Sequence, residues 1–167
     1  WNLFSAVGLA SILLTGGIGL LRLDRIWIAI KETAIPLVFG AAVVGTIGSR
    51  RPLVRMLLLN PSVIDTAAVD RALEERGSRG EFDALLVRGS WMVAASFLLS
   101  ACLNFCLAIW VLRSDPGTPQ FNQELGKMTA LSLPVISLPC LAVTVLALWY
   151  VLKGTARTTG LALDLIF

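Results

Sequence analysis

Long apolar runs separated by short polar segments dominate the chain. Four of them have the length at which a helix crosses a bilayer, namely 3–21, 26–47, 91–112 and 128–152. A helix needs about 20 mostly apolar residues to cross a hydrocarbon core roughly 30 Å thick. The segment 39–47 has no polar face, so lipid or other membrane helices are expected around it. The pattern predicts an all-α polytopic membrane protein with four transmembrane helices in a single domain, 1–167.

Composition agrees with this prediction, because 56% of the residues are hydrophobic and only 15% are charged. Indole rings favour the headgroup layer, where the N–H stays hydrated. The aromatic residues that lie at or near the ends of the apolar runs are Trp1, Trp27, Trp91, Trp110, Trp149 and Tyr150. The net charge of +3 is read as a topology signal, and nucleic-acid binding is not expected. The start at Trp1, almost directly in an apolar run, predicts a processed or incomplete N-terminus.

Basic residues predict the orientation. One side of the predicted bundle holds the long loop 48–90 and the C-terminus, with Arg50, Arg51, Arg55, Arg71, Arg76, Arg79, Arg88, Lys153 and Arg157. The opposite side holds Arg22, Arg25, Arg113 and Lys127. Lys and Arg are enriched in cytoplasmic loops, so the long loop and the C-terminus are predicted to be cytoplasmic.

The long loop is expected to contain one short amphipathic helix. Ser62 and Asp65 resemble a capping box, and Gly77 resembles a helix C-cap. The helix is therefore predicted over 63–76, with its less polar side formed by Ile64, Ala67, Ala68 and Ala72. It either lies on the membrane surface or docks a cytoplasmic partner. On the other side of the membrane, the loop 114–127 opens with turn residues, and Phe121 with Leu125 is expected to form one helical turn at the interface.

The adjacent pair Lys31 and Glu32 is the first candidate functional feature. Both residues lie inside the second apolar run, where an ionisable side chain is costly to insert. Adjacent helical residues point about 100° apart, so at least one of the two should face another helix or an aqueous pocket. Arg22, Asp24 and Arg25 lie at the same end of the run. The pair is either structural, with Lys31 snorkelling, or an ion, proton or ligand contact.

A polar stripe and several small residues complete the candidates. Ser96, Ser100 and Asn104 share one face of the third run, which should face another helix or line a substrate path. Small residues at four-residue spacing allow close helix packing within the bundle or in a homo-oligomer. These positions are Gly8, Ser11, Thr15, Gly16 and Gly19 in the first run, and Ala41 and Gly45 in the second.

The sequence contains no recognisable catalytic group. There is no histidine, and Cys102, Cys106 and Cys140 lie inside apolar runs, where a thiol is usually a packing residue. We therefore expect no metal site, no cofactor and no enzymatic activity.

Several short motifs resemble the bacterial intracellular septation protein A family. They are Thr15-Gly16-Gly17, Asp24, Trp27-Ile28, Lys31, Thr33, the basic segment Arg50-Arg51-Pro52-Leu53-Val54, Trp91, Leu103-Asn104, Ala108-Ile109-Trp110, Phe121, Gly126 and Thr129-Ala130-Leu131. The similarity covers most of residues 4–152, and this chain differs from the family by a longer cytoplasmic insertion, 60–83. The resemblance implies an inner-membrane protein of septation and envelope integrity that contacts division or cell-wall machinery.

Two functions follow from these features. The first is a non-enzymatic membrane protein that acts through contacts with other membrane proteins, including as an accessory subunit of a larger complex. In that case a variant lacking 60–83 should keep its fold and lose its partners. The second is a small ion-coupled transporter that uses Lys31, Glu32 and the polar stripe, completed by a dimer or by helices preceding Trp1.

Overall fold

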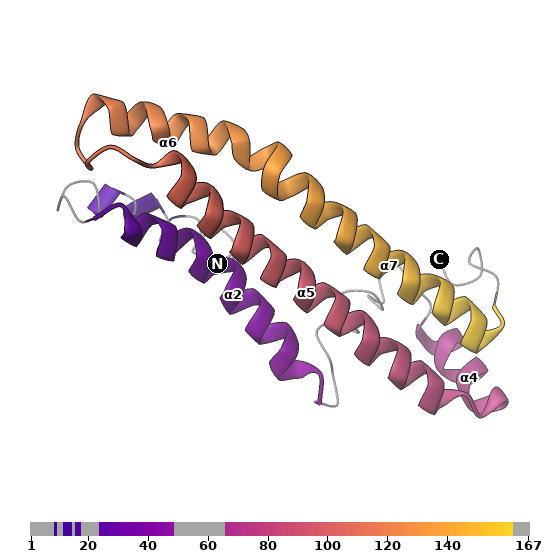
Figure 1. Ribbon diagram of the computed structural model, residues 1–167. Helices are drawn as coiled ribbons and strands as arrows, with labels where there is room; N and C mark the ends of the chain where they lie inside the picture. The colour runs from indigo at the N-terminus through magenta and orange to yellow at the C-terminus, as the bar shows by residue number, and fades with distance from the viewer. Residues whose placement is uncertain (1–8, 10–11, 15, 18–23, 49–65, 162–167) are drawn as a thin grey trace. The chain divides into compact units, whose positions relative to one another are not determined.

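The computed structural model describes residues 9, 12–14, 16–17, 24–48 and 66–161. Within these ranges the regular structure is entirely helical, as predicted, and contains no strand. Figure 1 shows the elements in chain order. They are α2 (Ile26–Thr46), α4 (Thr66–Arg76), α5 (Arg79–Val111), α6 (Pro119–Ser132), the π-helical segment η1 (Leu133–Ser137) and α7 (Leu138–Thr159).

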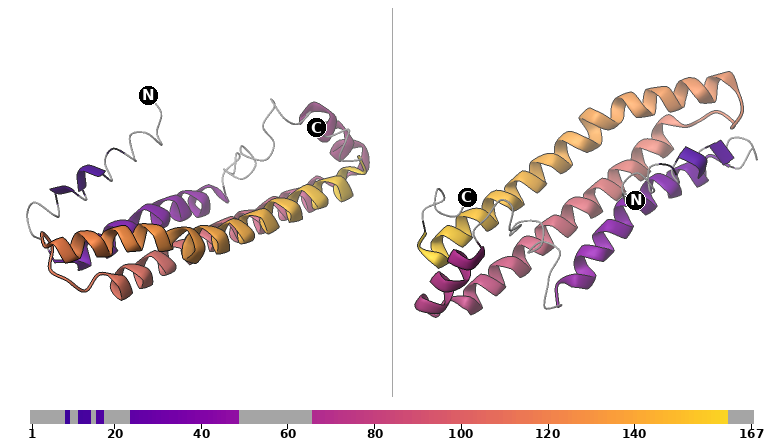
Figure 2. Two further views of the ribbon diagram at one scale, coloured as in Figure 1. Left: turned by 90° about the horizontal axis from the view of Figure 1, so that it is seen from above. Right: turned by 180° about the vertical axis from the view of Figure 1, so that it is seen from behind.

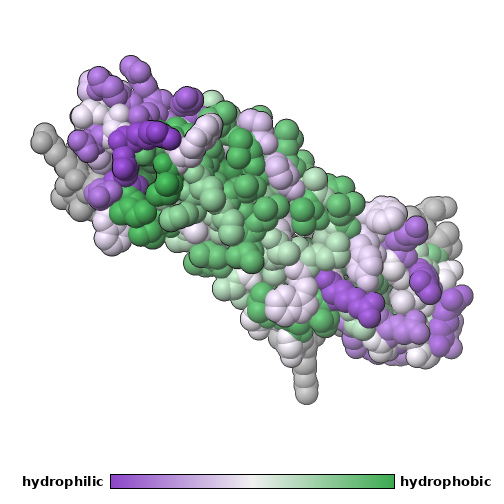
Figure 3. Space-filling model, in the orientation of Figure 1, coloured by the Kyte–Doolittle hydropathy of each residue, from purple (hydrophilic) through white to green (hydrophobic). Residues whose placement is uncertain are grey.

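Three described helices are long and apolar enough to span a membrane: Ile26–Thr46, Arg79–Val111 and the continuous helix Pro119–Thr159. They contain the predicted runs 26–47, 91–112 and 128–152 almost completely. Only 22%, 28% and 17% of their apolar stretches are buried within the protein. Figure 3 shows hydrophobic residues over the visible surface of the long helices and hydrophilic residues gathered at the helix ends. This much exposed apolar surface is consistent with a membrane protein. Most of the predicted run 3–21 lies outside the described residues, so a fourth span stays a prediction.

Helix α6 corrects the predicted outer loop 114–127. The helix begins at Pro119, with Thr118 as its N-cap, whose hydroxyl accepts a hydrogen bond from the Phe121 backbone N–H at 3.2 Å. Proline suits the first helical position because its missing N–H would have no partner there. Phe121 is buried in the core, whereas the sequence placed it at the membrane interface. The burial of one aromatic side chain thus stabilises a polar helix that hydropathy did not predict.

The π-helical segment η1 follows from the prolines of the fourth apolar run. Pro139 has no backbone N–H, and its ring clashes with the carbonyl four residues earlier in a regular α-helix. The chain responds with a wider turn, in which the Leu138 N–H bonds to the Leu133 carbonyl five residues earlier. The helix therefore continues through Pro134 and Pro139 without ending.

The turn from α4 to α5 confirms Gly77 as a C-cap. Gly77 has a φ of 62°, the left-handed region that glycine adopts at low cost. Its N–H bonds to the Glu74 carbonyl at 3.2 Å, and the Ser78 N–H bonds to the Leu73 carbonyl at 3.1 Å. These two bonds are the Schellman pattern, which satisfies the last carbonyls of α4. Helix α5 then begins at Arg79. The last part of the predicted loop 48–90 is therefore helical.

Contacts divide the chain into two compact units, Trp1–Val38 with Leu98–Cys140 and Phe39–Phe97 with Leu141–Phe167. The core of the first unit joins the start of α2, the end of α5, α6 and η1. Its buried residues are Ile28, Ala29, Leu107, Ala108, Val111, Leu112, Phe121, Met128 and Ile136. Phe121 and Met128 of α6 are buried in this core, and so is Ile136 of the π-helical segment η1.

The second unit packs α4 against α5 and α7. Figures 1 and 2 show α4 at the start of α5 and the end of α7. Its buried cluster consists of Val69, Leu73, Phe82, Leu85, Leu86 and Val151. The Ser78 hydroxyl also donates to the Thr158 carbonyl of α7 at 2.8 Å. The buried side of α4 is thus formed by Val69 and Leu73, whereas Ala67, expected on the less polar side, is exposed.

This packing changes the expectation for the insertion 60–83. Its deletion would remove Val69, Leu73 and Phe82 from a buried cluster, and each large apolar side chain stabilises a fold by about 1.5–3 kcal/mol. The insertion is part of the core of the second unit. Surface substitutions on α4 are therefore the appropriate test of its contacts.

Candidate functional site

Lys31 and Glu32 form an ion pair on α2. The Lys31 Nζ lies 2.6 Å from the Glu32 Oε1, and the side chains are 9% and 29% exposed. The flexible lysine stem lets the ammonium group reach the neighbouring carboxylate although the two residues leave the helix in different directions. The pair therefore carries two opposite charges in direct contact, which reduces the cost of placing them in an apolar helix.

The charges at the start of α2 organise the helix end. The Asp24 Oδ1 accepts a hydrogen bond from the Ile26 N–H at 3.0 Å, as an N-terminal cap does. The Arg25 guanidinium donates to the carbonyl of Arg113, at the end of α5. Arg22 lies outside the described residues. Asp24 and Arg25 therefore have structural contacts with the backbone of α2 and of the segment that follows α5.

Glu124 of α6 closes the turn between α5 and α6, a role that the sequence did not reveal. Its Oε2 accepts the backbone N–H groups of Arg113 at 2.8 Å and Ser114 at 2.9 Å, and its Oε1 accepts the Ser114 hydroxyl at 2.8 Å. The hydrogen bond from the Ser114 N–H is the main cause that lowers the pKa of Glu124. Burial raises this pKa. The hydrogen bonds from the Arg113 N–H and the Ser114 hydroxyl and the charge of Arg25 lower it further. The ionised carboxylate thus holds the end of α5 to α6.

Replacement of this carboxylate should lower stability in a pH-dependent way. Because the folded-state pKa of Glu124 is lowered, its contribution is present above the unfolded-state pKa and is lost as the pH falls through the folded-state value. We expect Glu124→Gln to melt at a lower temperature than the native chain at about pH 7, and the two melting temperatures to converge as the pH falls below the range in which the folded-state carboxyl is ionised. Thermal unfolding in detergent measures this, with the exposed Glu75→Gln as control. A temperature difference that does not depend on pH would contradict this role.

The polar stripe of α5 divides into two kinds of contact. Ser96 is buried, and its hydroxyl lies 3.0 Å from the Thr144 hydroxyl of α7, which makes it an interhelical contact. Asn104 instead donates within α5, to the Ser100 carbonyl at 2.8 Å and the Ser100 hydroxyl at 3.3 Å. Ser96 thus connects α5 to α7, whereas Ser100 and Asn104 form hydrogen bonds with each other within α5.

The close packing of α2 occurs at Gly40, which is not one of the predicted packing residues. A Cβ built on Gly40 would lie 3.2 Å from the Phe97 Cβ, and the neighbouring Phe39 ring stacks on Phe97 with centroids 5.9 Å apart. By contrast, a Cβ on Gly45 or Gly16 meets nothing within 4 Å, and Ala41 is exposed. Among the described residues, Ala41 and Gly45 therefore make no close helix contact, and their role in packing within the bundle or in a homo-oligomer stays a prediction.

Several predicted residues lie outside the described part of the chain. They are Gly8, Ser11, Thr15 and Gly19 of the first run, and Arg50, Arg51, Pro52 and Leu53 of the family-like motif. Among the described residues, no three His, Cys, Asp or Glu side chains gather as a metal site requires. Cys102 and Cys106, both exposed, are free thiols.

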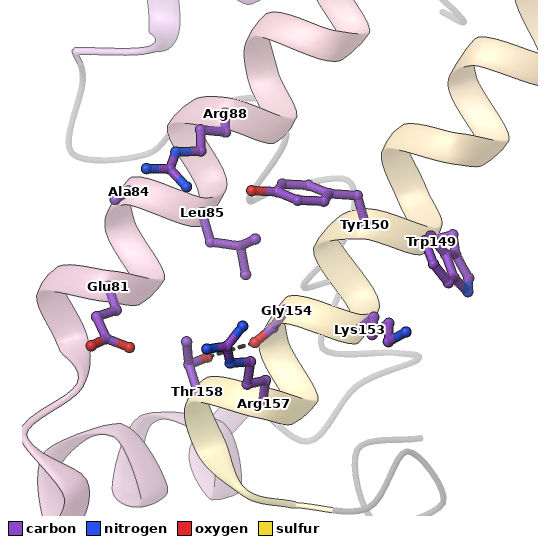
Figure 4. Close-up of a pocket in the computed structure, with 10 residues that line it drawn as sticks. All are labelled: Glu81, Ala84, Leu85, Arg88, Trp149, Tyr150, Lys153, Gly154, Arg157 and Thr158. Atoms are coloured by element: carbon purple, nitrogen blue, oxygen red, sulfur yellow. Dashed lines mark hydrogen bonds between the residues drawn. The ribbon is translucent and has the colours of Figure 1, made fainter.

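A pocket of about 460 Å³ lies between α5 and α7 in the second unit. We call it the α5–α7 pocket; its polar and aromatic lining consists of Glu81, Arg88, Trp149, Tyr150, Lys153, Arg157 and Thr158 (Figure 4). Leu85 and Gly154 bring the two helices together inside it, since a Cβ on Gly154 would clash with the Leu85 side chain. In the sequence, these basic residues indicate only the topology. The available signal was their position beside the apolar runs, since Arg88 lies three residues before 91–112 and Lys153 directly follows 128–152.

Comparison of the chain with protein-family models, with curated proteins and with solved structures found no match. The resemblance to the septation protein A family therefore stays a prediction, and function has to be argued from the described geometry.

Proposed function

We propose that this chain is a non-enzymatic multi-pass protein of the bacterial inner membrane, of the septation protein A type, that acts through contacts with other membrane proteins. The three long apolar helices, with most of their apolar surface exposed, support the membrane location. The exposed tryptophans Trp27, Trp91, Trp110 and Trp149 support it further, since indole rings favour the two interfaces of a bilayer.

The single observation that carries the proposal is the two-sided environment of α4. Val69 and Leu73 fix one side of the helix in the core of the second unit. Arg71, Glu74 and Glu75 are exposed, and the helix lies outside the three apolar helices. The Schellman turn at Gly77 and the hydrogen bond from Ser78 to Thr158 hold its end in place. A rigidly mounted helix with an exposed pattern of both charges is suited to recognise a protein by charge complementarity.

The test exchanges charges on that exposed side without changing the net charge. The double variant Arg71→Glu/Glu75→Lys is extracted with mild detergent from its native membranes, and its companions are measured by quantitative mass spectrometry. We expect the native chain to retain a stoichiometric membrane-protein companion and the variant to lose most of it. The control Asn122→Lys/Lys127→Gln alters exposed residues of α6 at equal net charge and should retain it.

A companion that stays with the α4 variant would contradict the proposed contact surface. A native chain that purifies without any companion would contradict the proposed function itself. Equal melting temperatures of the native chain and both variants show that the comparison concerns contacts and not folding.

The transporter is kept as the second candidate because the Lys31 side chain is only 9% exposed on an apolar helix. The direct pairing of Lys31 with Glu32 favours a structural role, since the two charges compensate each other. We therefore expect Lys31→Ala and Glu32→Gln to leave ion flux in reconstituted vesicles unchanged. Flux through the native protein that either substitution reduces about tenfold or more would favour the transporter instead.

A further inference from the structure

We propose that the α5–α7 pocket binds the phosphate-bearing headgroup of an anionic phospholipid. Three basic side chains line it, Arg88, Lys153 and Arg157, against one acidic side chain, Glu81. The lining therefore carries an excess of positive charge. Basic pockets between transmembrane helices on the cytoplasmic side are the environment in which anionic headgroups bind.

The basic groups are available for a ligand. Among the described residues, no hydrogen bond or ion pair engages the guanidinium group of Arg88 or of Arg157. The Lys153 Nζ lies 4.7 Å from the centre of the Trp149 ring, a cation–π contact that leaves its N–H donors free to bond. Guanidinium groups bind phosphate through two parallel hydrogen bonds, and an ammonium group adds a compact charge.

The pocket lies where a headgroup would be found. Arg88 precedes the exposed Trp91 by three residues on α5, and Lys153 follows the exposed Trp149 by four residues on α7. Both basic residues are thus about one helical turn, roughly 5 Å, beyond a tryptophan that marks the edge of an apolar run. In Figure 4 the Tyr150 hydroxyl points across the pocket towards α5, where it can add a further donor.

The size and surroundings of the pocket fit a headgroup with its chains outside. A volume of about 460 Å³ accommodates a small polar group, and the Leu85–Gly154 contact closes the space between the helices. Val145 and Leu146, one turn before Trp149, are exposed and apolar. They provide a surface along which acyl chains would pack. A free phosphate would use the charges but not this surface, and on that basis the site is assigned to lipid.

Native mass spectrometry of the purified full chain in detergent tests the assignment. The protein is titrated with phosphatidylglycerol, with phosphatidylcholine of the same chain length, and with inorganic phosphate as competitor. We expect one phosphatidylglycerol to bind more tightly than phosphatidylcholine, and Arg88→Gln/Lys153→Gln to weaken its binding about tenfold or more. The charge-matched control Arg71→Gln/Lys127→Gln, which removes two exposed basic residues outside the pocket, should bind as the native chain does.

The variant Arg88→Lys/Lys153→Arg keeps both charges and should restore most of the affinity, which separates loss of binding from loss of folding. Binding that persists in the double glutamine variant, or that falls equally in the control, would overturn the proposal. Displacement of the lipid by inorganic phosphate at an equal concentration would also overturn it, because the site would then hold a soluble anion. None of these outcomes depends on the protein partner of α4.

Discussion

Phe82→Ala should lower the free energy of unfolding by about 3–5 kcal/mol, the largest effect expected of any substitution considered for this chain. Phe82 is 1% exposed, and it packs with Val69 and Leu73 of α4 and with Val151 of α7. Removal of the ring would leave a cavity, because the backbones of the two long helices α5 and α7 cannot move enough to fill it. Leu73→Ala removes the contact from the α4 side and should cost about 2–5 kcal/mol.

Unfolding of the detergent-solubilised protein by sodium dodecyl sulfate, followed by circular dichroism, measures these losses. The exposed neighbour Asp83→Ala is the matched control and should change the free energy by less than about 0.5 kcal/mol. If Phe82→Ala and Asp83→Ala behave alike, α4 is not anchored to α5 and α7. In that case α4 would not present a rigid surface to a partner.

Gly40→Leu should destabilise the protein by about 1–3 kcal/mol, whereas Gly45→Leu on the same helix should not. A Cβ on Gly40 is already within 3.2 Å of the Phe97 Cβ, so a larger side chain has to separate α2 from α5. Nothing lies within 4 Å of a Cβ on Gly45. Both substitutions gain about 0.8–1 kcal/mol of helix propensity, so the difference between them isolates the steric cost.

The same detergent titration compares the two variants directly. Equal stabilities would show that α2 does not pack closely on α5 at Gly40. A loss at Gly45 alone would show that the small residues of α2 face a further helix, as the sequence pattern had predicted for Ala41 and Gly45.

Hydropathy predicted the described spans well because length and apolarity are local properties. The run 26–47 became α2, Ile26–Thr46, with Asp24 capping its start. Helix α5 begins 12 residues before the predicted span, because its first turns carry Arg79, Glu81 and Asp83 and are stabilised by the burial of Phe82. Before the run 128–152, helix α6 was predicted only as one turn at Phe121 and Leu125 for the same reason, since burial of Phe121 is a tertiary effect. Polar helices outside an apolar run leave no hydropathy signal.

The candidate sites show the same limit. The proximity of Lys31 and Glu32 follows from their adjacency, and the structure adds the 2.6 Å contact. The contacts of Glu124 with Arg113 and Ser114 and the meeting of Arg88 with Lys153 in one pocket depend on which helix faces lie together. Helices that are apolar on all sides do not reveal this in their periodicity. For the same reason, small-residue spacing alone did not identify Gly40 as the packing glycine.

The central claim is that α5 crosses a membrane and places α4 and the α5–α7 pocket on the cytoplasmic side. It is tested most directly by site-specific labelling in a chain whose Cys102, Cys106 and Cys140 are replaced by alanine. Glu75→Cys on α4 and Gln120→Cys on α6 each introduce one exposed thiol, and intact cells are treated with a membrane-impermeant maleimide. The account predicts that the thiol at position 120 reacts at once and that the thiol at position 75 reacts only after permeabilisation. Equal reactivity of both thiols in intact cells would contradict it.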